Sequence, residues 1–372
     1  MGRVLAGVLM VCLSLPCYVW YAGQTPSFAP PGPGPHAAPL VAQPTVPPYQ
    51  LLNESQPAPL EELLGLADDD AVSLIDVRGF RWLLAPAAPG VCAPLVLVLV
   101  HTATDHTEHR RLIRETWGSW GSQGQAHAGE VLVRFLVGQT AASDAGVEEQ
   151  RRLEEEAAVH GDVVQGSFTD AYRNMTYKHA MGLKWFATKC PNAKYVLKVD
   201  DDAFVNTPVL LDFVRHALSP HGARRLLACT VVTGARVRRS WRSKWRVAYG
   251  EFPGHQYPDY CEGWAVLYSP DVALALYREL QRGPYFWIDD VYVTGVLAAR
   301  LGLAHAAWDP LVLTAGDLPR MLSGEQRPAF MLALWYSTNM DMATERQLWA
   351  RVVSDTERAR ALNTTWTPSR RL

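Results

Sequence analysis

Three consecutive carboxylates, Asp200-Asp201-Asp202, follow directly on an apolar, β-prone run at Tyr195–Val199. Three adjacent acids repel one another, so burying them in a fold requires a cation or strong hydrogen-bond donors. Ligands of α/β sheets bind outside the carboxyl ends of the strands, which is where this triplet would stand. Carboxylate oxygens there suit Mg²⁺ or Mn²⁺ that bridges the phosphates of a substrate. The pattern therefore predicts a divalent-metal site, with a solvated acidic turn as the alternative.

Two further groups of residues offer chemistry. Asp289 and Asp290 form a second acidic pair just before an apolar stretch, where acids ordinarily complement the dipole of a helix. Arg236–Arg239 and Arg242–Arg246 form two basic clusters interleaved with aromatic residues. These clusters predict either a local anion-binding patch or a solvated loop. The net charge of −2 gives no indication of a nucleic-acid partner.

The elements that must position these side chains alternate between strand and helix patterns. Strands are predicted at four apolar runs: Leu95–Val100, Val131–Gly138, Asp162–Gln165 and Tyr195–Val199. Helices are predicted between them: His106–Trp117, Glu148–His160 and Thr176–Cys190. Such alternation is typical of an α/β fold with a mixed, mostly parallel sheet and helices on both faces. The acidic triplet then lies at the end of a central strand.

The N-terminal part predicts a membrane-anchored organisation. Val4–Ala22 is an uncharged run of about 19 residues, long enough to cross a bilayer as a retained signal anchor rather than a cleaved signal. Residues 1–3 are then a cytoplasmic tail, and residues 23–77 are a Pro-rich stem that cannot form a packed core. Residues 78–372 are predicted to form the lumenal domain.

Cysteines and sequons agree with a secretory route. Four cysteines lie beyond the anchor, without the CxxC spacing of a zinc site: Cys92, Cys190, Cys229 and Cys261. In an oxidising lumen they predict two disulfides, and three connectivities remain open. Three Asn-x-Ser/Thr sequons are candidate glycosylation sites: Asn53, Asn174 and Asn363.

Five motifs in order, within roughly residues 80 to 300, carry a family resemblance. They are Arg110–Gly118, Tyr172–Lys178, Lys198–Asp202, Tyr257–Gly263 and Asp289–Val291. With these motifs the chain resembles the Golgi family of β-1,3-galactosyltransferases and β-1,3-N-acetylglucosaminyltransferases, which has the Rossmann-like GT-A fold. The resemblance implies a type II Golgi membrane protein with a lumenal catalytic domain.

The resemblance also implies a reaction and roles for four acids. Members transfer a sugar from a UDP-sugar to the 3-hydroxyl of an acceptor glycan on glycoprotein or glycolipid, with inversion. By resemblance Asp202 binds Mn²⁺, Asp200 lies near the nucleotide ribose, and Asp201 is a positioning residue. Asp290 is the expected catalytic base, since inverting transfer requires a base for the acceptor hydroxyl. Galactose is favoured as the donor sugar, with N-acetylglucosamine as the alternative.

Other motif residues carry open alternatives. Three are candidate cofactor-binding residues: Arg110, Arg114 and Lys178. The two arginines either reach the nucleotide or pair with internal acids, and the lysine lies either beside the donor or on a helix face. Three tryptophans are assigned to the core: Trp117, Trp185 and Trp264. Trp287 either stacks on a sugar face or packs in the core.

Departures from the family pattern put metal binding in question. The family has a C-terminal histidine as a second metal ligand, but Met331–Ser337 holds none and no histidine follows His305, a remote substitute. Glu262 stands where the family has serine, and Asp289 stands where it has glutamate. These departures motivate a rival reading, a catalytically weak relative that serves as a lumenal binding or chaperone subunit. A lectin-like module without donor chemistry is a third reading.

Overall fold

The computed structural model describes residues 48–56, 72–86, 92–120, 129–308, 311–312, 315–325 and 341–361. The chain divides into two compact units, Met1–Thr45 and Val46–Leu372, and every described residue belongs to the second. The predicted anchor, most of the predicted stem, Met331–Ser337 and the Asn363 sequon lie outside the described residues. Within the described part, no helix combines the length and apolar character needed to cross a membrane.

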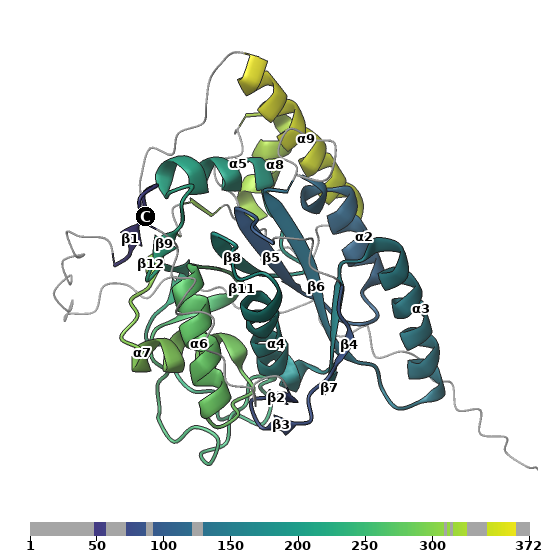
Figure 1. The fold of residues 1–372 in the computed structure, drawn as a ribbon, viewed down its shortest axis with the longest axis vertical. Helices are drawn as coiled ribbons and strands as arrows, with labels where there is room; N and C mark the ends of the chain where they lie inside the picture. The colour runs from purple at the N-terminus through teal and green to yellow at the C-terminus, as the bar shows by residue number, and fades with distance from the viewer. Residues whose placement is uncertain are drawn as a thin grey trace, which may run out of the picture. The chain divides into compact units, whose positions relative to one another are not determined.

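A mixed sheet of eight strands forms the centre of the second unit (Figure 1). Its strand order is β12-β10-β11-β8-β5-β6-β7-β4. The bounds are β4 (Trp82–Leu84), β5 (Val96–His101), β6 (Val131–Gln139), β7 (Val163–Thr169), β8 (Tyr195–Asp200), β10 (Leu227–Val232), β11 (Tyr260–Tyr268) and β12 (Ala306–Ala307). Strands β8, β5, β6 and β7 are mutually parallel, as is β12 to β10. Strand β11 runs antiparallel to both β8 and β10, and β4 antiparallel to β7.

The predicted mixed, mostly parallel α/β sheet is confirmed, and β8 with its acidic end is one of its central strands. Strand β5 is buried along its whole length, which explains its continuous apolar sequence. One central strand, β11, was not among the predicted strands: it begins at Tyr260, within the motif Tyr257–Gly263. Hydrogen bonding to the neighbouring strands β8 and β10 overrides the local turn signals.

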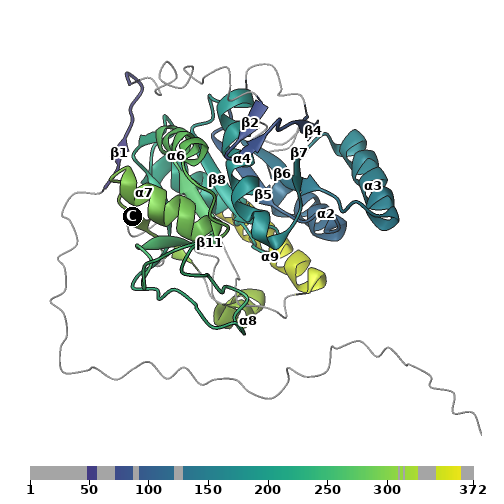
Figure 2. The same cartoon turned by 90° about the horizontal axis from the view of Figure 1, so that it is seen from below.

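Helices cover both faces of this sheet. The α-helices are α2 (Thr107–Glu115), α3 (Asp144–His160), α4 (Met175–Lys189), α5 (Thr207–Asp212), α6 (Pro270–Arg282), α7 (Ala298–Arg300), α8 (Leu318–Ser323) and α9 (Met342–Ala361). Short 3₁₀ turns are η2 (Trp117–Ser119), η3 (Tyr172–Asn174) and η7 (Ala315–Asp317), and π-helical segments are η4 (Phe213–Ala217) and η5 (Asp290–Leu297). Helix α4 packs on β5, β6 and β7 and α6 packs on β8, while α9 lies across the sheet from them in Figure 2.

Part of the predicted stem belongs to the folded unit. Strand β1 (Gln50–Leu51) pairs with β9 (Ala223–Arg224), and Tyr49 and Leu52 are buried. A second small ladder joins β2 (Ser73–Leu74) to β3 (Val77–Arg78). The compact unit therefore begins at Val46, earlier than the boundary of residue 78 expected from composition.

Two disulfides join the four cysteines. Cys92 pairs with Cys190, and Cys229 pairs with Cys261. The second bridge links β10 to β11 two residues before Gly263, so it fixes the strand beside the acidic end of β8. The structure thereby selects one of the three connectivities left open by the sequence.

Candidate active site

The acidic triplet begins at the carboxyl end of β8, where Asp200 stands opposite His101 of β5. Lys198, on the same strand, is buried, and its Nζ donates to Asp200 Oδ1 at 2.5 Å and to the carbonyl oxygen of Gly263. Burial raises the pKa of Asp200 to about 6, although Lys198 opposes the effect. Lys198 thus connects the triplet to strand β11.

Asp201 turns toward helix α2. Its Oδ2 accepts a hydrogen bond from Thr102 Oγ1 at 2.6 Å and lies 2.7 Å from His106 Nδ1. The Asp201 carbonyl oxygen lies 3.3 Å from His109 Nδ1. Burial alone would raise the pKa of Asp201, but the bonds from His106 and Thr102 outweigh it and lower the pKa. The same contact raises the pKa of His106.

These contacts form a group that fits a divalent metal. His106, His109 and Asp201 each offer one ligand atom, all within 4.8 Å of one another, the one such group found among the described residues. Imidazole nitrogens suit Zn²⁺ and Fe²⁺, whereas carboxylate oxygens suit Mn²⁺, so the mixed donor set fits a divalent transition metal without selecting one. The carboxylate of Asp202, the predicted metal ligand, is exposed at the next position of the same turn. His305 Nε2 lies 2.7 Å from the Thr294 carbonyl oxygen, and the structure does not bring it into this group.

Sequence reasoning missed His106, the N-cap of α2, and His109 in its first turn. The available signal was their spacing of three residues at the start of a predicted helix next to a strand end. Nothing in the sequence alone showed that the chain after β5 returns to the end of β8.

Asp290 begins the π-helical segment η5 and lies against β11. Gly263 permits this approach, because a Cβ at that position would stand 3.2 Å from Asp290 Oδ2. Burial, followed by the charge of Asp289, raises the pKa of Asp290 to about 7. A carboxylate with a pKa near neutrality suits a general base. π-Helical segments occur frequently at functional sites.

Asp289 has the opposite electrostatics. Its Oδ2 lies 3.0 Å from His179 Nδ1, and His179 Nε2 lies 3.0 Å from the hydroxyl of Tyr268. Burial alone would raise the pKa of Asp289, but His179 and Lys198 outweigh it and lower the pKa. Adjacent acids whose pKa values are driven apart are a recurring feature of acid–base sites. Asp290 is therefore the carboxylate of this pair suited to exchange a proton near neutral pH.

The three predicted cofactor-binding cations are used inside the protein. Arg110 is fully buried and forms a bidentate pair with Glu156 at 2.8 and 2.7 Å. Arg114 pairs with Asp162 at 2.8 Å and with Glu156. The prediction that these arginines reach the nucleotide is therefore corrected, and the internal-acid alternative holds.

Lys178 is also structural. Its buried Nζ donates to Asp170 Oδ1 at 2.9 Å and to the carbonyl oxygen of Thr102. It ties α4 to the ends of β7 and β5, so its charge is paired inside the protein, and these contacts do not support the predicted binding of the donor. Through the carbonyl oxygen of Thr102, Lys178 also helps to fix the residue whose hydroxyl donates to Asp201.

The aromatic residues of the motifs are buried. Trp117, Trp185 and Trp264 lie in the core as predicted. Trp287 is also buried, and the guanidinium of Arg173 lies 4.4 Å from its ring centroid, so core packing describes it better than sugar stacking. Glu262 accepts a hydrogen bond from Trp264 Nε1 at 3.1 Å.

The two described sequons differ. Asn53 is exposed. Asn174 Nδ2 donates to the Thr169 carbonyl oxygen at 2.8 Å, and Thr176 of the same sequon is buried. The folded chain therefore presents Asn53 for modification more readily than Asn174.

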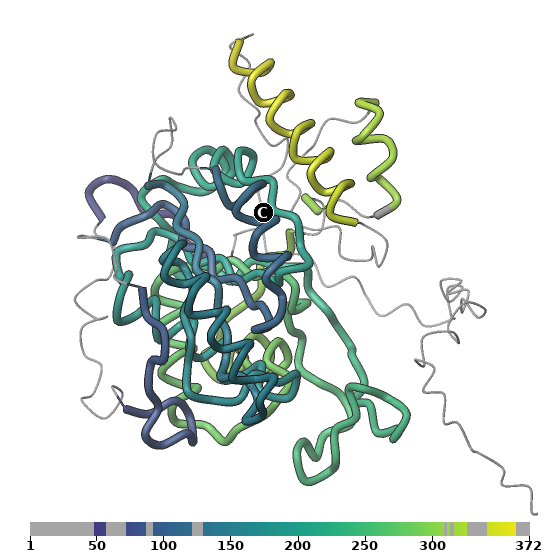
Figure 3. Tube along the Cα trace, turned by 90° about the vertical axis from the view of Figure 1, so that its right-hand side faces the viewer, coloured from purple at the N-terminus to yellow at the C-terminus, as the bar shows by residue number. Residues whose placement is uncertain are grey.

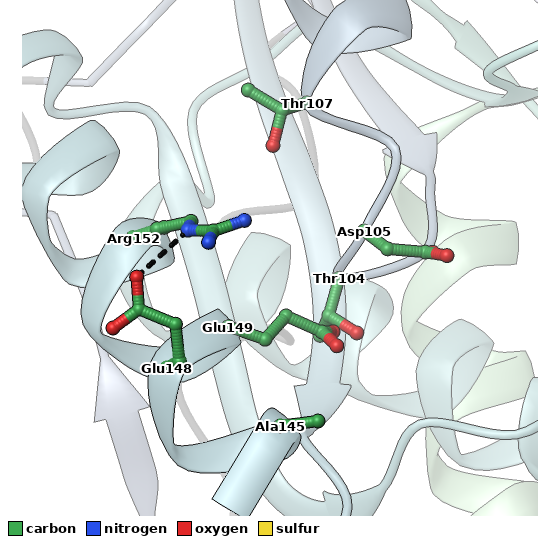
Figure 4. Close-up of a pocket in the computed structure, with 7 residues that line it drawn as sticks. All are labelled: Thr104, Asp105, Thr107, Ala145, Glu148, Glu149 and Arg152. Atoms are coloured by element: carbon green, nitrogen blue, oxygen red, sulfur yellow. Dashed lines mark hydrogen bonds and ion pairs between the residues drawn. The ribbon is translucent and has the colours of Figure 1, made fainter.

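A surface pocket of about 290 Å³ lies apart from the predicted site residues, between the segment after β5 and helix α3 (Figure 4). It is lined by Thr104, Asp105, Thr107, Ala145, Glu148, Glu149 and Arg152. Arg152 Nε pairs with Glu148 at 3.0 Å across one side. No predicted site residue lines it, so it does not enter the candidate site.

Comparison with known proteins identifies the family. The family model described as Galactosyltransferase matches residues 108–309, more than half of the chain. The chain belongs to this galactosyltransferase family. The matched range contains the acidic triplet, His109 and the Asp289–Asp290 pair, and His106 lies just before it. The resemblance read from the five motifs is thereby confirmed.

Individual relatives agree with the family assignment. The chain is 37% identical over 253 residues to human acetylgalactosaminyl-O-glycosyl-glycoprotein beta-1,3-N-acetylglucosaminyltransferase, covering 65% of this chain and 62% of that protein. It is 32% identical over 211 residues to human beta-1,3-galactosyltransferase 1, covering 56% and 61%. The chain thus spans about three fifths of each of these relatives. The solved WbbM bifunctional glycosyltransferase superposes with a TM-score of 0.34 at 11% identity, covering 71% of this chain and 45% of that one, too weak a likeness to bear on the site.

Proposed function

We propose that this protein is an inverting β-1,3-glycosyltransferase of GT-A type. It transfers a hexose, with galactose favoured over N-acetylglucosamine, from a UDP-sugar to the 3-hydroxyl of an acceptor glycan on glycoprotein or glycolipid. The relatives named above include both donor classes. One observation carries the proposal. Lys198 bonds to Asp200 and to Gly263, and Gly263 lies against Asp290, so the acidic triplet and the candidate base form one cluster.

Within this proposal Asp290 accepts the proton of the acceptor hydroxyl as that oxygen attacks the sugar. Its pKa of about 7 lets it be ionised at working pH while remaining basic enough to take a proton. Asp289, held ionised by His179 and Lys198, maintains that pKa. Within the proposal Asp200 lies near the nucleotide ribose, and Lys198 holds its carboxylate in position.

Asp201 and Asp202 with His106 and His109 are the residues that would hold Mn²⁺. When bound, the metal supplies Lewis-acid stabilisation of the departing diphosphate. The two histidines offer nitrogen ligands in place of the family's C-terminal histidine. Thr102 and His106 orient the Asp201 carboxylate toward this group.

We also propose a Golgi membrane location, with residues 4–22 as signal anchor and the catalytic unit in the lumen. The length and apolar character of that run support the anchor. The two disulfides support an oxidising compartment. Fluorescent tagging of the full chain, with protease protection of the C-terminal tag, tests the topology.

The activity is tested with the purified full-length chain, Mn²⁺, UDP-galactose or UDP-N-acetylglucosamine, and a panel of acceptor glycosides. Turnover that is abolished by Asp290→Asn and by Asp202→Ala supports the enzyme. UDP binding without turnover on any acceptor overturns it in favour of the binding or chaperone subunit. Absence of UDP binding would overturn both of these readings in favour of the lectin-like module.

A further inference from the structure

The loop between β10 and β11 carries an unusual exposed surface. Residues 236–251, hereafter the aromatic–basic loop, extend away from the sheet in the tube view (Figure 3). The loop exposes three large aromatic side chains: Trp241 at 77%, Trp245 at 46% and Tyr249 at 62%. Only one other exposed tryptophan, tyrosine or phenylalanine is found among the described residues, Tyr172 at 54%. An exposed aromatic cluster of this kind marks an interaction site.

The loop is also strongly cationic. Five exposed basic residues fall between positions 236 and 246, where there is no acid: Arg236, Arg238, Arg242, Lys244 and Arg246. The whole chain has a net charge of −2, so this charge is local. Arg242 lies over the ring of Trp241 at 5.0 Å, and Lys244 lies over the ring of Trp245 at 4.4 Å. Cations placed over aromatic rings keep their outer donors available to an anion.

Internal contacts hold the loop in shape. Arg239, the one cation of the loop that is not exposed, donates to the carbonyl oxygens of Val247, Phe252 and Gly254 at 2.7 to 2.9 Å. Its guanidinium also lies 4.1 Å from the ring centroid of Tyr249. The aromatic surface is therefore presented on an ordered scaffold, which lowers the entropy lost on binding.

The loop joins the flank of the candidate active site. Trp245 Nε1 donates to the hydroxyl of Tyr172 at 2.9 Å, and Tyr172 lies 6.0 Å, between ring centroids, from Trp287. Trp287 precedes the Asp289–Asp290 pair by two residues. Arg173 stacks on Trp287 and pairs with Glu251 of the loop at 3.4 Å. The exposed aromatic surface is thus connected, through Tyr172 and Trp287, to the segment that carries Asp290.

We propose that the aromatic–basic loop, with Tyr172, binds the acceptor glycan and selects acceptors that carry an anionic group, a sulfate or a sugar carboxylate. This inference rests on the proposed function and names its substrate class. Aromatic faces pack on the apolar faces of sugar rings, and Arg242 and Lys244 donate charge-assisted hydrogen bonds to the anion. The proposed function assigns the donor diphosphate to the end of β8, so these cations are left for the acceptor.

Matched acceptors test the proposal on the full-length chain. A neutral disaccharide glycoside, its sulfated form and its sialylated form are compared under the donor that gives turnover. Both anionic forms, or the one whose anion reaches the loop, are expected to have a KM about tenfold lower at low salt, with the advantage shrinking at high salt. A paired Arg242→Ala/Lys244→Ala variant is expected to lose that advantage, whereas Trp245→Ala raises KM for every acceptor.

The control removes two exposed cations elsewhere. Lys189→Ala/Arg224→Ala makes the same change in charge at the end of α4 and in β9, and the anionic preference is expected to persist. Equal KM values for neutral and anionic acceptors, or a preference that survives Arg242→Ala/Lys244→Ala, overturn the proposal.

Binding measured without donor separates this inference from the proposed function. Tryptophan fluorescence is titrated with the sulfated, sialylated and neutral disaccharides, and with anionic phospholipid vesicles. Selective binding of an anionic glycan that is lost in Arg242→Ala/Lys244→Ala supports the loop's role even if no acceptor is turned over. Absence of turnover alone would contradict the proposed transferase activity and not the binding role of the loop. Binding of the vesicles but of no glycan overturns the acceptor role.

Discussion

The replacements Asp290→Asn and Asp289→Asn are expected to change the free energy of unfolding in opposite directions: the first raises it and the second lowers it. Folding raises the pKa of Asp290 from 3.8 to about 7, first by burial and then by the charge of Asp289. The folded state therefore binds this proton more tightly than the unfolded state, and stability falls as pH rises between these two values. The difference between the folded and unfolded pKa values of Asp290 corresponds to a destabilisation of roughly 4 kcal/mol. We expect about half of it to remain after solvent screening at this partly exposed side chain.

Asp290→Asn removes the free-energy cost of ionising this buried carboxyl. The free energy of unfolding at pH 8 is expected to rise by about 2 kcal/mol, equivalent to about 3 °C in Tm for a unit of this size. Little gain is expected at pH 4, because folded Asp290 is protonated there and the unfolded carboxyl, with a pKa of 3.8, is only about half ionised. The assay is thermal unfolding at both pH values with the disulfides intact.

Asp289→Asn is the matched control. His179 and Lys198 lower the pKa of Asp289, so its contribution to stability is present above the unfolded pKa and lost as pH falls through the folded one. Its replacement is expected to destabilise the protein at pH 8, because buried Lys198 loses a counter-charge and His179 loses a charged hydrogen-bond partner. Destabilisation at pH 8 by Asp290→Asn, or an equal gain at pH 4 and pH 8, would refute the electrostatic account of the pair.

Three further predictions concern the surroundings of the site. Gly263→Ala places a Cβ 3.2 Å from the candidate base carboxylate, so kcat is expected to fall about tenfold with KM little changed; an unchanged kcat would show that the contact is not critical. Arg110→Met removes the buried bidentate partner of Glu156, which keeps its ion pair with Arg114, and is expected to cost about 3 kcal/mol in urea unfolding, whereas Met at the exposed Arg111 costs less than about 1 kcal/mol; similar losses would contradict the structural role. Replacing Cys229 and Cys261 together by serine opens a loop of sequence separation 32 and is expected to cost about 3 to 4 kcal/mol in the same assay, a prediction that an unshifted midpoint would exclude.

Local sequence patterns predicted the parallel part of the sheet and its acidic end. The largely apolar runs of β5 and β8 indicate strands that are buried on both faces. Carboxylates next to such a run are therefore expected at the end of the strand, outside its buried part. The family motifs added Asp290, whose position before a helix is indistinguishable from that of an ordinary N-terminal acid. The comparisons then confirmed the family that these motifs indicated.

What the sequence could not supply was pairing across long separations. An arginine within a family motif has the same appearance whether it faces a nucleotide or an internal acid, and only the fold brings Glu156 to Arg110. In the same way, His106 and His109 are candidate ligands because the fold brings the start of α2 beside the turn after β8. The antiparallel strand β11 was missed because its turn-prone start is held by hydrogen bonds to distant strands.

The central claim, that Asp290 serves as base in an inverting transfer from a UDP-sugar, is tested most directly by one comparison. Wild-type protein and the Asp290→Asn variant are incubated with donor, Mn²⁺ and acceptor, and the product is quantified and its linkage determined by NMR. A β-1,3-linked product from the wild type, with a rate that rises toward a plateau above a pH of about 7, and a loss of at least about a hundredfold in the variant are predicted. A variant that transfers sugar at the wild-type rate, or a product of retained configuration, would contradict the account.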